Sequence, residues 1–299
     1  MNLLITGAWK PRQEALASIA AMGHSVYFQP MESDPPSTDF SRIQGVIGNG
    51  LFLHHSPDDF PCLRYVQLTS AGFDRVPVEE LQARGVLIHN ARGVYSIPMA
   101  EFALAGVLQL YKQMDHFRCA KQNHLWSKHR GVLELFGKKL CVLGCGSVGQ
   151  ACAKVFSALG CEVEGVDIAP FTSPYFRHIY PLESLDQALG RADVVILCLP
   201  LLAGTLRLFD ETRFSKMKDG AVFVNISRGK LVDSAALLTA LRERLRGAVL
   251  DVFEEEPLGQ ESPLWNMDNV VLTPHNSFVG DGNGLRLEKV ILENLEKFS

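Results

Sequence analysis

The first third of the chain alternates short apolar segments with helical or polar ones. Apolar runs with strand character recur at residues 3–6, 25–29, 45–47, 65–69 and 86–89. Between the first two runs, residues 13–22 carry apolar side chains at helical spacing and end at Gly23. Strands that alternate with helices favour a parallel sheet covered by helices.

The rest of the chain repeats this alternation on a larger scale. An amphipathic helix is predicted from Ile97 to about Gln113, with Pro98 in its first turn, and a helical pattern continues to about Asn123. Six further strands are predicted at residues 140–143, 162–166, 194–197, 221–225, 248–250 and 270–273. Helical patterns follow at residues 148–159, 234–245 and 284–298. The whole chain is therefore predicted to be α/β.

The first strand of this second series runs into a glycine-rich turn. Gly144, Gly146 and Gly149 form a G-x-G-x-x-G pattern between the strand at 140–143 and the helix at 148–159. In that pattern the first glycine permits a tight turn, the second lets the backbone approach a pyrophosphate, and the third lets helix and strand pack closely. Ser147 and Val148 open the helix, where backbone N–H groups attract phosphate.

An acid follows the next strand. Asp167 lies 18 residues past Gly149, near the spacing of about 20 expected for the acid that holds the adenosine ribose hydroxyls. A carboxylate there repels a 2′-phosphate, so the sequence favours NAD over NADP.

These patterns together predict two doubly wound α/β domains. Residues 96–275 are expected to form the larger, Rossmann-type NAD-binding domain. Residues 1–95 and 276–299 are expected to form a smaller, flavodoxin-like substrate domain, because the last helix is expected to return to it. The active-site cleft is expected between the two.

Composition excludes several classes of protein. Apolar residues make up 47% of the 299, the net charge is −4, and no basic block stands out, which argues against nucleic acid as a partner. No apolar run reaches the roughly 18 residues of a membrane span. The N-terminus has the pattern of a first strand and not of a signal peptide, so a cytoplasmic location is expected. The seven cysteines form no C-x-x-C or zinc-finger spacing, so reduced, mostly buried thiols and no metal site are predicted.

Polar residues with catalytic potential follow three late strands, at the sheet edge where open α/β sheets bind ligands. Arg228 follows the strand at 221–225, and a guanidinium there can grip a carboxylate, although a loop-capping arginine is an alternative. Glu254, Glu255 and Glu256 taken alone suggest a solvated loop. His275 follows the last strand; a histidine in such a place is often structural, yet imidazole is a natural proton donor at neutral pH.

In their order, these motifs resemble the D-isomer-specific 2-hydroxyacid dehydrogenases. They are G-x-G-x-x-G with Asp167, S-R-G-x-x-V-D at 227–233, L-D-V-F-x-x-E-P at 250–257 and T-P-H at 273–275. Three further segments also match the family's pattern, namely residues 69–74, residues 99–101 and the P-L-x-x-x-T pattern of 200–205. The resemblance covers nearly the whole chain.

The resemblance implies a role for each matched position. Arg228 would bind the carboxylate and keto oxygen of a 2-oxo acid, His275 would exchange the proton with that oxygen, and Glu256 would pair with His275. The backbone N–H groups of Ala71 and Gly72 would hold the substrate carboxylate. Further contacts to the cofactor would come from Pro200, Thr205, Ile226, Ser227 and Asp251. The family habit is a homodimer, and Phe117 and Trp126 are candidates for its interface.

The sequence departs from the family pattern at three places, which bear on the expected substrate and on the walls of the cofactor and substrate sites. Phe278 stands where many relatives have small residues, and the segment after the last helix is short. Residues 48–53 carry no arginine, and a phosphorylated substrate would require extra cations. We therefore expect a small or apolar 2-oxo acid.

Two alternatives stay open at this point. One is an NAD(H)-sensing protein on the same fold, and the other is a dehydrogenase of another small anion such as formate. The joint presence of Arg228, Glu256 and His275 counts against both, because neither function requires a proton donor.

Overall fold

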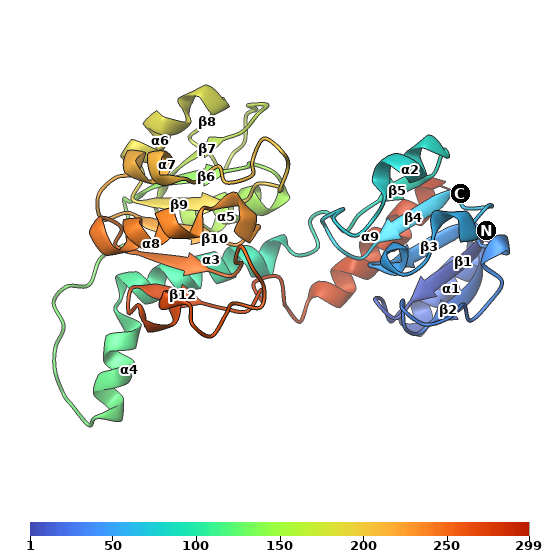
Figure 1. Cartoon of the computed structure of the whole chain (residues 1–299), viewed down its shortest axis with the longest axis horizontal. Coiled ribbons are helices and arrows are strands. Elements are labelled where there is room, and N and C mark those ends of the chain that lie inside the picture. The colour runs from blue at the N-terminus through green and yellow to red at the C-terminus, as the bar shows by residue number, and fades with distance from the viewer. Residues whose placement is uncertain (299) are drawn as a thin grey trace. The chain divides into compact units, whose positions relative to one another are not determined.

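The computed structural model describes residues 1–298, which form two compact units (Figure 1). The smaller unit contains Met1–Tyr95 and the chain from Gly280 onward. The larger unit is Ser96–Val279, so it extends to Val279 and not only to residue 275.

The smaller unit is built on a five-stranded parallel sheet. The strand order is β2-β1-β3-β4-β5, the flavodoxin-like order in which the sheet reverses direction between β1 and β3. The strands are β1 (Asn2–Thr6), β2 (Ser25–Gln29), β3 (Gly45–Gly48), β4 (Tyr65–Leu68) and β5 (Leu87–His89). Each lies within one residue of its predicted bounds.

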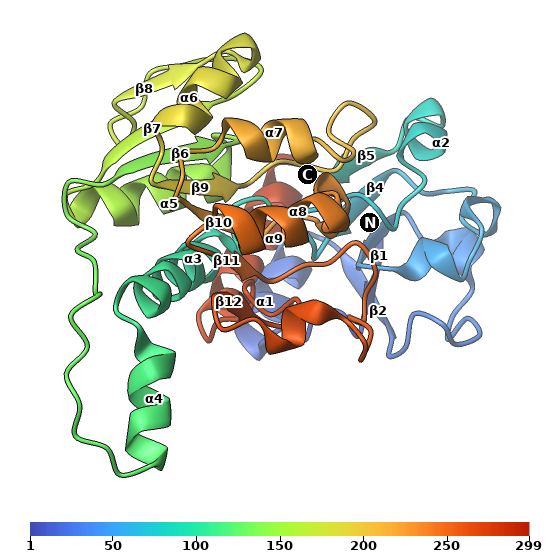
Figure 2. The ribbon, with the colours of Figure 1, turned by 60° about the vertical axis from the view of Figure 1, so that its left-hand side comes forward.

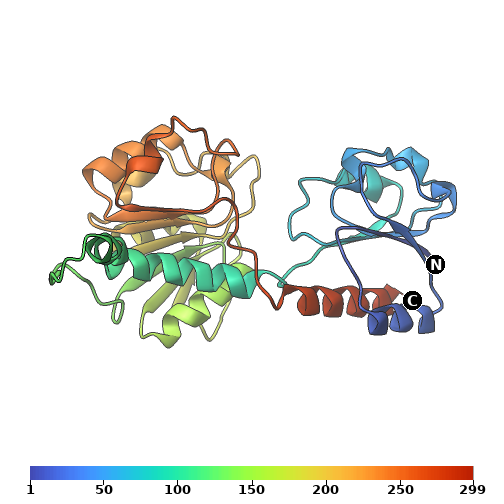
Figure 3. The ribbon, with the colours of Figure 1, turned by 90° about the horizontal axis from the view of Figure 1, so that it is seen from below.

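Helices cover both faces of this sheet. α1 (Gln13–Ala21) and α9 (Asn283–Phe298) pack side by side on one face, and α2 (Val78–Ala83) lies on the other (Figure 3). Alternate residues of β1 point to opposite faces, because side chains along a strand alternate. Leu3 and Ile5 pack toward the α1 and α9 side, and Leu4 packs into the second core.

The larger unit contains a seven-stranded parallel sheet. Its order is β12-β11-β10-β9-β6-β7-β8, the Rossmann order with one strand added at one edge. The strands are β6 (Lys139–Leu143), β7 (Glu162–Val166), β8 (His178–Tyr180), β9 (Val194–Leu197), β10 (Val222–Asn225), β11 (Gly247–Leu250) and β12 (Val270–Leu272). The sequence predicts only six of these, because β8 is a three-residue edge strand without an apolar run.

Two helical layers sandwich this sheet. α3 (Ser96–Tyr111) and α5 (Ser147–Ala158) cover one face, and α6 (Leu185–Arg191), α7 (Glu211–Lys216) and α8 (Ser234–Glu243) cover the other (Figure 3). The central strands β9 and β10 are buried on both sides and almost wholly apolar, as expected of a parallel sheet between helices. The two cores therefore take alternate residues of the same strand: Leu140 and Val142 face one layer, and Cys141 and Leu143 face the other.

The helix predicted to end near Gln113 is α3, and the helical pattern predicted to continue to about Asn123 forms a separate helix. Gln113 has φ 54°, a left-handed conformation that ends α3 and redirects the chain into α4 (Met114–Gln122). α4 and the extended segment after it project from the larger unit (Figure 2). None of the helices within residues 1–298 combines the length and apolar character that a membrane span requires.

Candidate active site

The three glycines of the dinucleotide motif occupy three different environments. Gly144 has φ +86°, and a Cβ on it would lie 2.7 Å from the carbonyl oxygen of Cys198. A Cβ on Gly149 would lie 2.1 Å from the carbonyl oxygen of Gly144. Around Gly146, in contrast, no atom lies within 4 Å of the Cβ position. The turn is thus closed toward the protein at two glycines and open at the middle one, which fits a pyrophosphate against the backbone.

The helix that follows the turn presents its N-terminus at the same place. Gly146 is the N-cap residue of α5, Ser147 and Val148 form the first turn, and no side chain caps this end. First-turn N–H groups have no partners inside the helix, so they favour an anionic group. β6 and β9 are neighbours here, and this is the point where the strand order reverses.

Asp167 lies one residue beyond β7 and is held against the glycine-rich turn. Its Oδ2 accepts a hydrogen bond from the Cys145 N–H at 2.7 Å, and its Oδ1 accepts one from the Ala169 N–H at 3.2 Å. Burial raises the pKa of the Cys145 thiol to about 12, so this sulfur adds no negative charge to the turn. The next residue, Ile168, is exposed and offers no cation to a 2′-phosphate.

The loop after β9 is closed by one hydroxyl. Thr205 Oγ1 donates to the carbonyl oxygen of Pro200 at 2.7 Å and accepts from the Leu202 N–H at 2.8 Å. Ser227 Oγ, from the loop after β10, donates to the Leu199 carbonyl. Because the Ile226 side chain is buried in the core, only its backbone can face a cofactor. All of these predicted cofactor positions lie at the carboxyl edge of the larger sheet.

Glu256 and His275 form the pair on which acid–base chemistry depends. His275 Nδ1 lies 2.8 Å from Glu256 Oε2, and Glu256 Oε1 accepts a hydrogen bond from the Phe253 N–H at 3.0 Å. The backbone thus fixes the carboxylate, and the carboxylate orients the ring. With Nδ1 engaged, Nε2 is the nitrogen that can meet a substrate. The ring of Phe278, the predicted departure, lies nearly perpendicular to that of His275, with the ring centroids 6.0 Å apart.

A fully buried carboxylate holds the loop that carries His275. Asp251, 0% exposed, accepts hydrogen bonds from Thr273 Oγ1 at 2.7 Å, the Asn276 N–H at 2.7 Å and the Ser277 N–H at 2.9 Å. The His275 N–H donates to the Asp251 carbonyl oxygen at 2.8 Å. His275 itself has φ 51°, a left-handed conformation that is uncommon outside glycine. Asp251 is therefore the residue that holds this loop in shape.

Arg228 follows β10 in a loop that packs directly on the Glu256 loop. Its Nη1 donates to the Ser227 carbonyl at 2.8 Å, and the buried Asn225 donates from Nδ2 to the Arg228 carbonyl at 3.0 Å. A Cβ on Gly229 would lie 1.9 Å from the carbonyl carbon of Phe253. The backbones of the two loops are therefore in contact, and β10, β11 and β12 are adjacent strands.

We expect Gly229→Ala to separate these two loops. The new Cβ meets backbone, which cannot move aside as a flexible side chain can, so overpacking costs about 1–3 kcal/mol of stability. A displacement of about 1 Å at a reacting group lowers kcat/KM about 10²-fold. Thermal unfolding and steady-state kinetics measure both effects. Gly259→Ala is the matched control, because nothing lies within 4 Å of its Cβ position; equal activity of the two variants would contradict the packing argument.

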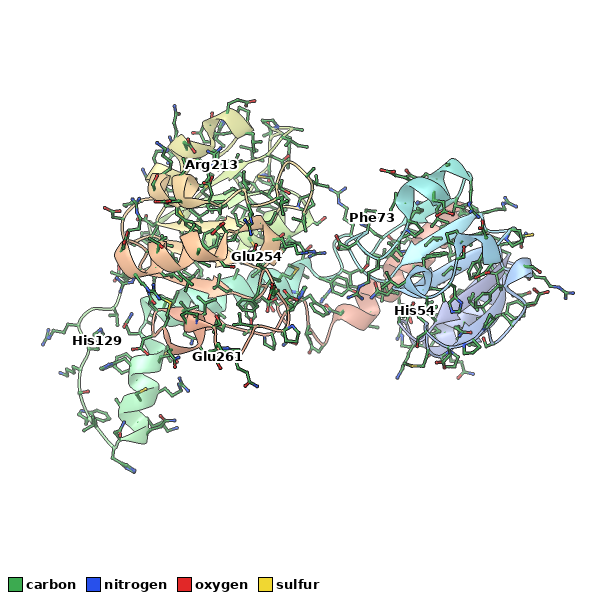
Figure 4. All side chains as sticks on the ribbon, viewed as in Figure 1. His54, Phe73, His129, Arg213, Glu254 and Glu261 are labelled. Atoms are coloured by element: carbon green, nitrogen blue, oxygen red, sulfur yellow. The ribbon has the colours of Figure 1, made fainter. Side chains whose placement is uncertain are left out.

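The two predicted substrate residues of the smaller unit lie in the loop after β4. The carbonyl oxygens of Ala71 and Gly72 accept hydrogen bonds from Asn90 Nδ2 at 2.6 Å and Ser70 Oγ at 3.0 Å. Within residues 1–298 no hydrogen bond uses the N–H of either residue. Phe73, labelled in Figure 4, continues the same loop. The loop is thus anchored through its carbonyls, and its N–H groups are available to a carboxylate.

Two of the three consecutive acids, Glu254 and Glu256, make side-chain contacts with different partners. Glu254, labelled in Figure 4, pairs with Arg207 at 2.7 Å and accepts from Ser234 Oγ at 2.9 Å. Hydrogen bonding to Arg207 lowers the pKa of Glu254. Glu256 pairs with His275, so two of the three acids are anchored, while Glu255 and Glu256 remain exposed as expected of a solvated loop. In the part of the chain that the structure describes, no cluster of three or more His, Cys, Asp or Glu side chains is placed to hold a metal ion.

Comparison with known proteins identifies the family. The model of the D-isomer specific 2-hydroxyacid dehydrogenase NAD binding domain matches residues 104–277. The chain belongs to this family. A crystal structure of a D-isomer specific 2-hydroxyacid dehydrogenase from Xanthobacter autotrophicus, in complex with NADPH and MES, is 28% identical with a TM-score of 0.80, covering 100% of this chain and 95% of that one. The Rossmann-like α/β fold is thereby confirmed.

Curated relatives span several activities. D-3-phosphoglycerate dehydrogenase of Mycobacterium tuberculosis is 38% identical over 219 residues, which are 72% of this chain and 41% of that protein. The chain therefore spans about two-fifths of the length of that relative. Glyoxylate reductase of Aeropyrum pernix is 34% identical over 256 residues, covering 80% of this chain and 74% of that protein.

Proposed function

We propose that the chain is an NAD-dependent oxidoreductase that interconverts small 2-oxo acids and D-2-hydroxy acids. The observation that carries this proposal is the Glu256–His275 pair at 2.8 Å, on a loop whose backbone is fixed by Asp251. Arg228 lies on the loop that packs against the Glu256 loop. An acid–base group, its orienting carboxylate and a guanidinium are the groups that reduction of a 2-oxo acid requires.

The proposed chemistry divides between the cofactor and the chain. When bound, reduced nicotinamide supplies the hydride that adds to C2 of the 2-oxo acid. His275 Nε2 gives a proton to the keto oxygen, and Glu256 stabilises the imidazolium beforehand and holds the ring in place. Arg228 neutralises the carboxylate and the charge that develops on the oxygen. In the direction of oxidation, the same nitrogen accepts the hydroxyl proton.

We propose NAD as the cofactor on the basis of Asp167. Asp167→Asn keeps an oxygen acceptor for the Cys145 N–H but removes the negative charge. Removing like-charge repulsion should raise kcat/KM with NADPH relative to NADH about 10-fold or more, and Asp167→Ala should act in the same direction. Glu183→Gln removes an exposed charge of the same unit and should leave the ratio unchanged. An unchanged ratio in both Asp167 variants would mean that another residue selects the cofactor.

For the substrate we propose a 2-oxo acid without a phosphate group. Residues 48–53 offer no arginine, although one group of relatives acts on phosphoglycerate by name. The test is to follow NADH absorbance with a panel of 2-oxo acids, neutral and phosphorylated. Turnover of neutral acids supports the proposal. NADH binding without turnover of any acid would favour a sensor, and preference for a phosphorylated acid would overturn the substrate class.

We propose that the enzyme is a homodimer and that the projecting α4 region forms the contact. Trp126 is 100% exposed, and Phe117 and Leu125 are exposed near it. Large apolar side chains gathered on a projecting segment are typical of an interface. Light scattering measures the mass in solution, and a monomeric mass would contradict this part of the proposal.

A further inference from the structure

A carboxylate of the chain itself occupies the reversal point of the smaller sheet. Glu32 lies three residues beyond β2 and reaches across the end of β1 to the end of β3. Its Oε1 accepts hydrogen bonds from Thr6 Oγ1 and from the Asn49 N–H, both at 2.7 Å. Its Oε2 accepts one from the Gly50 N–H at 2.7 Å. Three donors from two strands thus converge on one carboxylate.

The place and the donors are those of an anion-binding site. Ligands of open α/β sheets bind at the carboxyl ends of strands where the order reverses, and here that point is between β1 and β3. Successive backbone N–H groups form a concave surface that prefers anions. Glu32 supplies the anion, so the cradle that Thr6, Asn49 and Gly50 form is already filled. The Glu32 carboxylate packs directly against Gly48, because a Cβ on this glycine would lie only 2.8 Å from Glu32 Oε1.

This filled cradle lies beside the loop assigned to the substrate carboxylate. Gly48 at the end of β3 pairs with Leu68 at the end of β4, and the Thr69 N–H donates to the Gly48 carbonyl at 2.9 Å. Ala71 and Gly72 lie in the loop that follows β4. Adjacent strands are about 4.8 Å apart. The side chain of a 2-oxo acid whose carboxylate is bound by the loop after β4 would therefore reach the end of β3 with a chain of only a few bonds.

Because the N–H groups of Asn49 and Gly50 donate to Glu32, the groups left for a ligand at the end of β3 are mainly hydrogen-bond acceptors. Among residues 1–298, Asn49 Oδ1 is also buried without a hydrogen-bond partner. One basic side chain approaches: Arg75 Cδ lies 3.9 Å from the Cβ position of Gly50. Within the described residues no ion pair joins Arg75 to Glu32. A second negative charge on a substrate would therefore meet a fixed carboxylate.

We propose that Glu32 is a specificity-determining residue that excludes 2-oxo acids carrying a second negative charge and admits those with a neutral side chain. This inference rests on the proposed function. The excluded classes are phosphomonoesters and dicarboxylates, since both would compete with Glu32 for the same three donors.

The first test compares substrates. In the wild type, pyruvate and 2-oxobutyrate should be reduced with higher kcat/KM than 2-oxoglutarate and phosphohydroxypyruvate. Glu32→Gln, which removes the charge, should raise the ratio of charged to neutral substrates about 10-fold, and Glu32→Ala should raise it further. Glu14→Gln, an exposed charge removed from α1 of the same unit, should leave the ratio unchanged. An unchanged ratio in both Glu32 variants, or a wild type that prefers the charged acids, would overturn the proposal.

The second test does not depend on turnover. Calorimetry with inorganic phosphate should show saturable binding to Glu32→Ala and none to the wild type, because the variant exposes the Thr6 hydroxyl and two N–H groups. Adding Arg75→Gln should weaken that binding. Equal phosphate binding by wild type and Glu32→Ala would contradict the filled cradle. If no 2-oxo acid is reduced by the wild type but the variant gains phosphate binding, the proposed function fails while the cradle stands. If Glu32→Ala does not fold, Glu32→Gln still decides the substrate ratio.

Discussion

Replacing His275 with alanine should lower turnover by about 10²- to 10⁴-fold, the usual contribution of a positioned acid–base group, while NADH binding survives. The ring is a proton carrier in this account and touches neither the glycine-rich turn nor Asp167. Steady-state kinetics and NADH fluorescence titration measure the two effects separately. A comparable loss of turnover and of NADH binding would show that the histidine is structural.

The backbone of His275 provides a second comparison. Its φ of 51° suits asparagine better than most residues. The free energy of unfolding of His275→Asn should therefore lie within about 1 kcal/mol of the wild-type value, as expected where a half-exposed side chain is replaced. His275→Asn should nevertheless be as inactive as the alanine variant. His178→Ala removes an exposed imidazole from β8 and should leave turnover unchanged. Full activity of His275→Asn would rule out the imidazole as the proton donor.

Removing the Asp251 carboxylate should affect both folding and catalysis. Asp251→Ala leaves the Thr273 hydroxyl and the N–H groups of Asn276 and Ser277 without their acceptor inside the protein. Unsatisfied buried polar groups cost about 1–3 kcal/mol each, so we expect a loss of about 3 kcal/mol in the free energy of unfolding. Because the same bonds hold the His275 loop, kcat should fall about 10²-fold. Denaturant titration and kinetics measure these two losses.

Two further variants separate the role of the Asp251 charge from a general effect of removing an acid. Asparagine keeps one acceptor but turns an amide group toward a donor, so the loss of stability should be smaller while kcat still falls. Asp268→Asn, an exposed acid just before β12, is the matched control and should change neither quantity. Wild-type kcat in Asp251→Asn would mean that the loop does not depend on this carboxylate.

Much of the fold could be predicted because buried parallel strands are apolar on both faces. The apolar run of β9 (Val194–Leu197) has its predicted bounds unchanged, and so has β7 (Glu162–Val166), although β7 carries two glutamates. β8 (His178–Tyr180) could not be predicted because it is an edge strand that pairs only with β7. An edge strand needs few buried apolar side chains, so its sequence shows no apolar run. The sequence places the end of α3 near Gln113, but the left-handed backbone of Gln113 that separates α3 from α4 could not be predicted, since such a glutamine leaves no pattern in the sequence.

The candidate site could be predicted only in part. Its chemical groups follow strands in the order that the sequence gives, and the resemblance implies the contact of Glu256 with His275. The roles of Asp251 and Gly229 depend on which loops touch, and strand adjacency decides that. Glu32 looks like an ordinary loop acid in the sequence, because its partners are backbone N–H groups, which every residue but proline carries.

The most direct test of the central claim uses NADH deuterated at the transferable position of the nicotinamide ring. With wild-type protein and a neutral 2-oxo acid, the product should be a D-2-hydroxy acid that carries the deuterium at C2, and His275→Ala should form it only at a greatly reduced rate. Bound NADH without any deuterated product, or a product of the L configuration, would contradict the account.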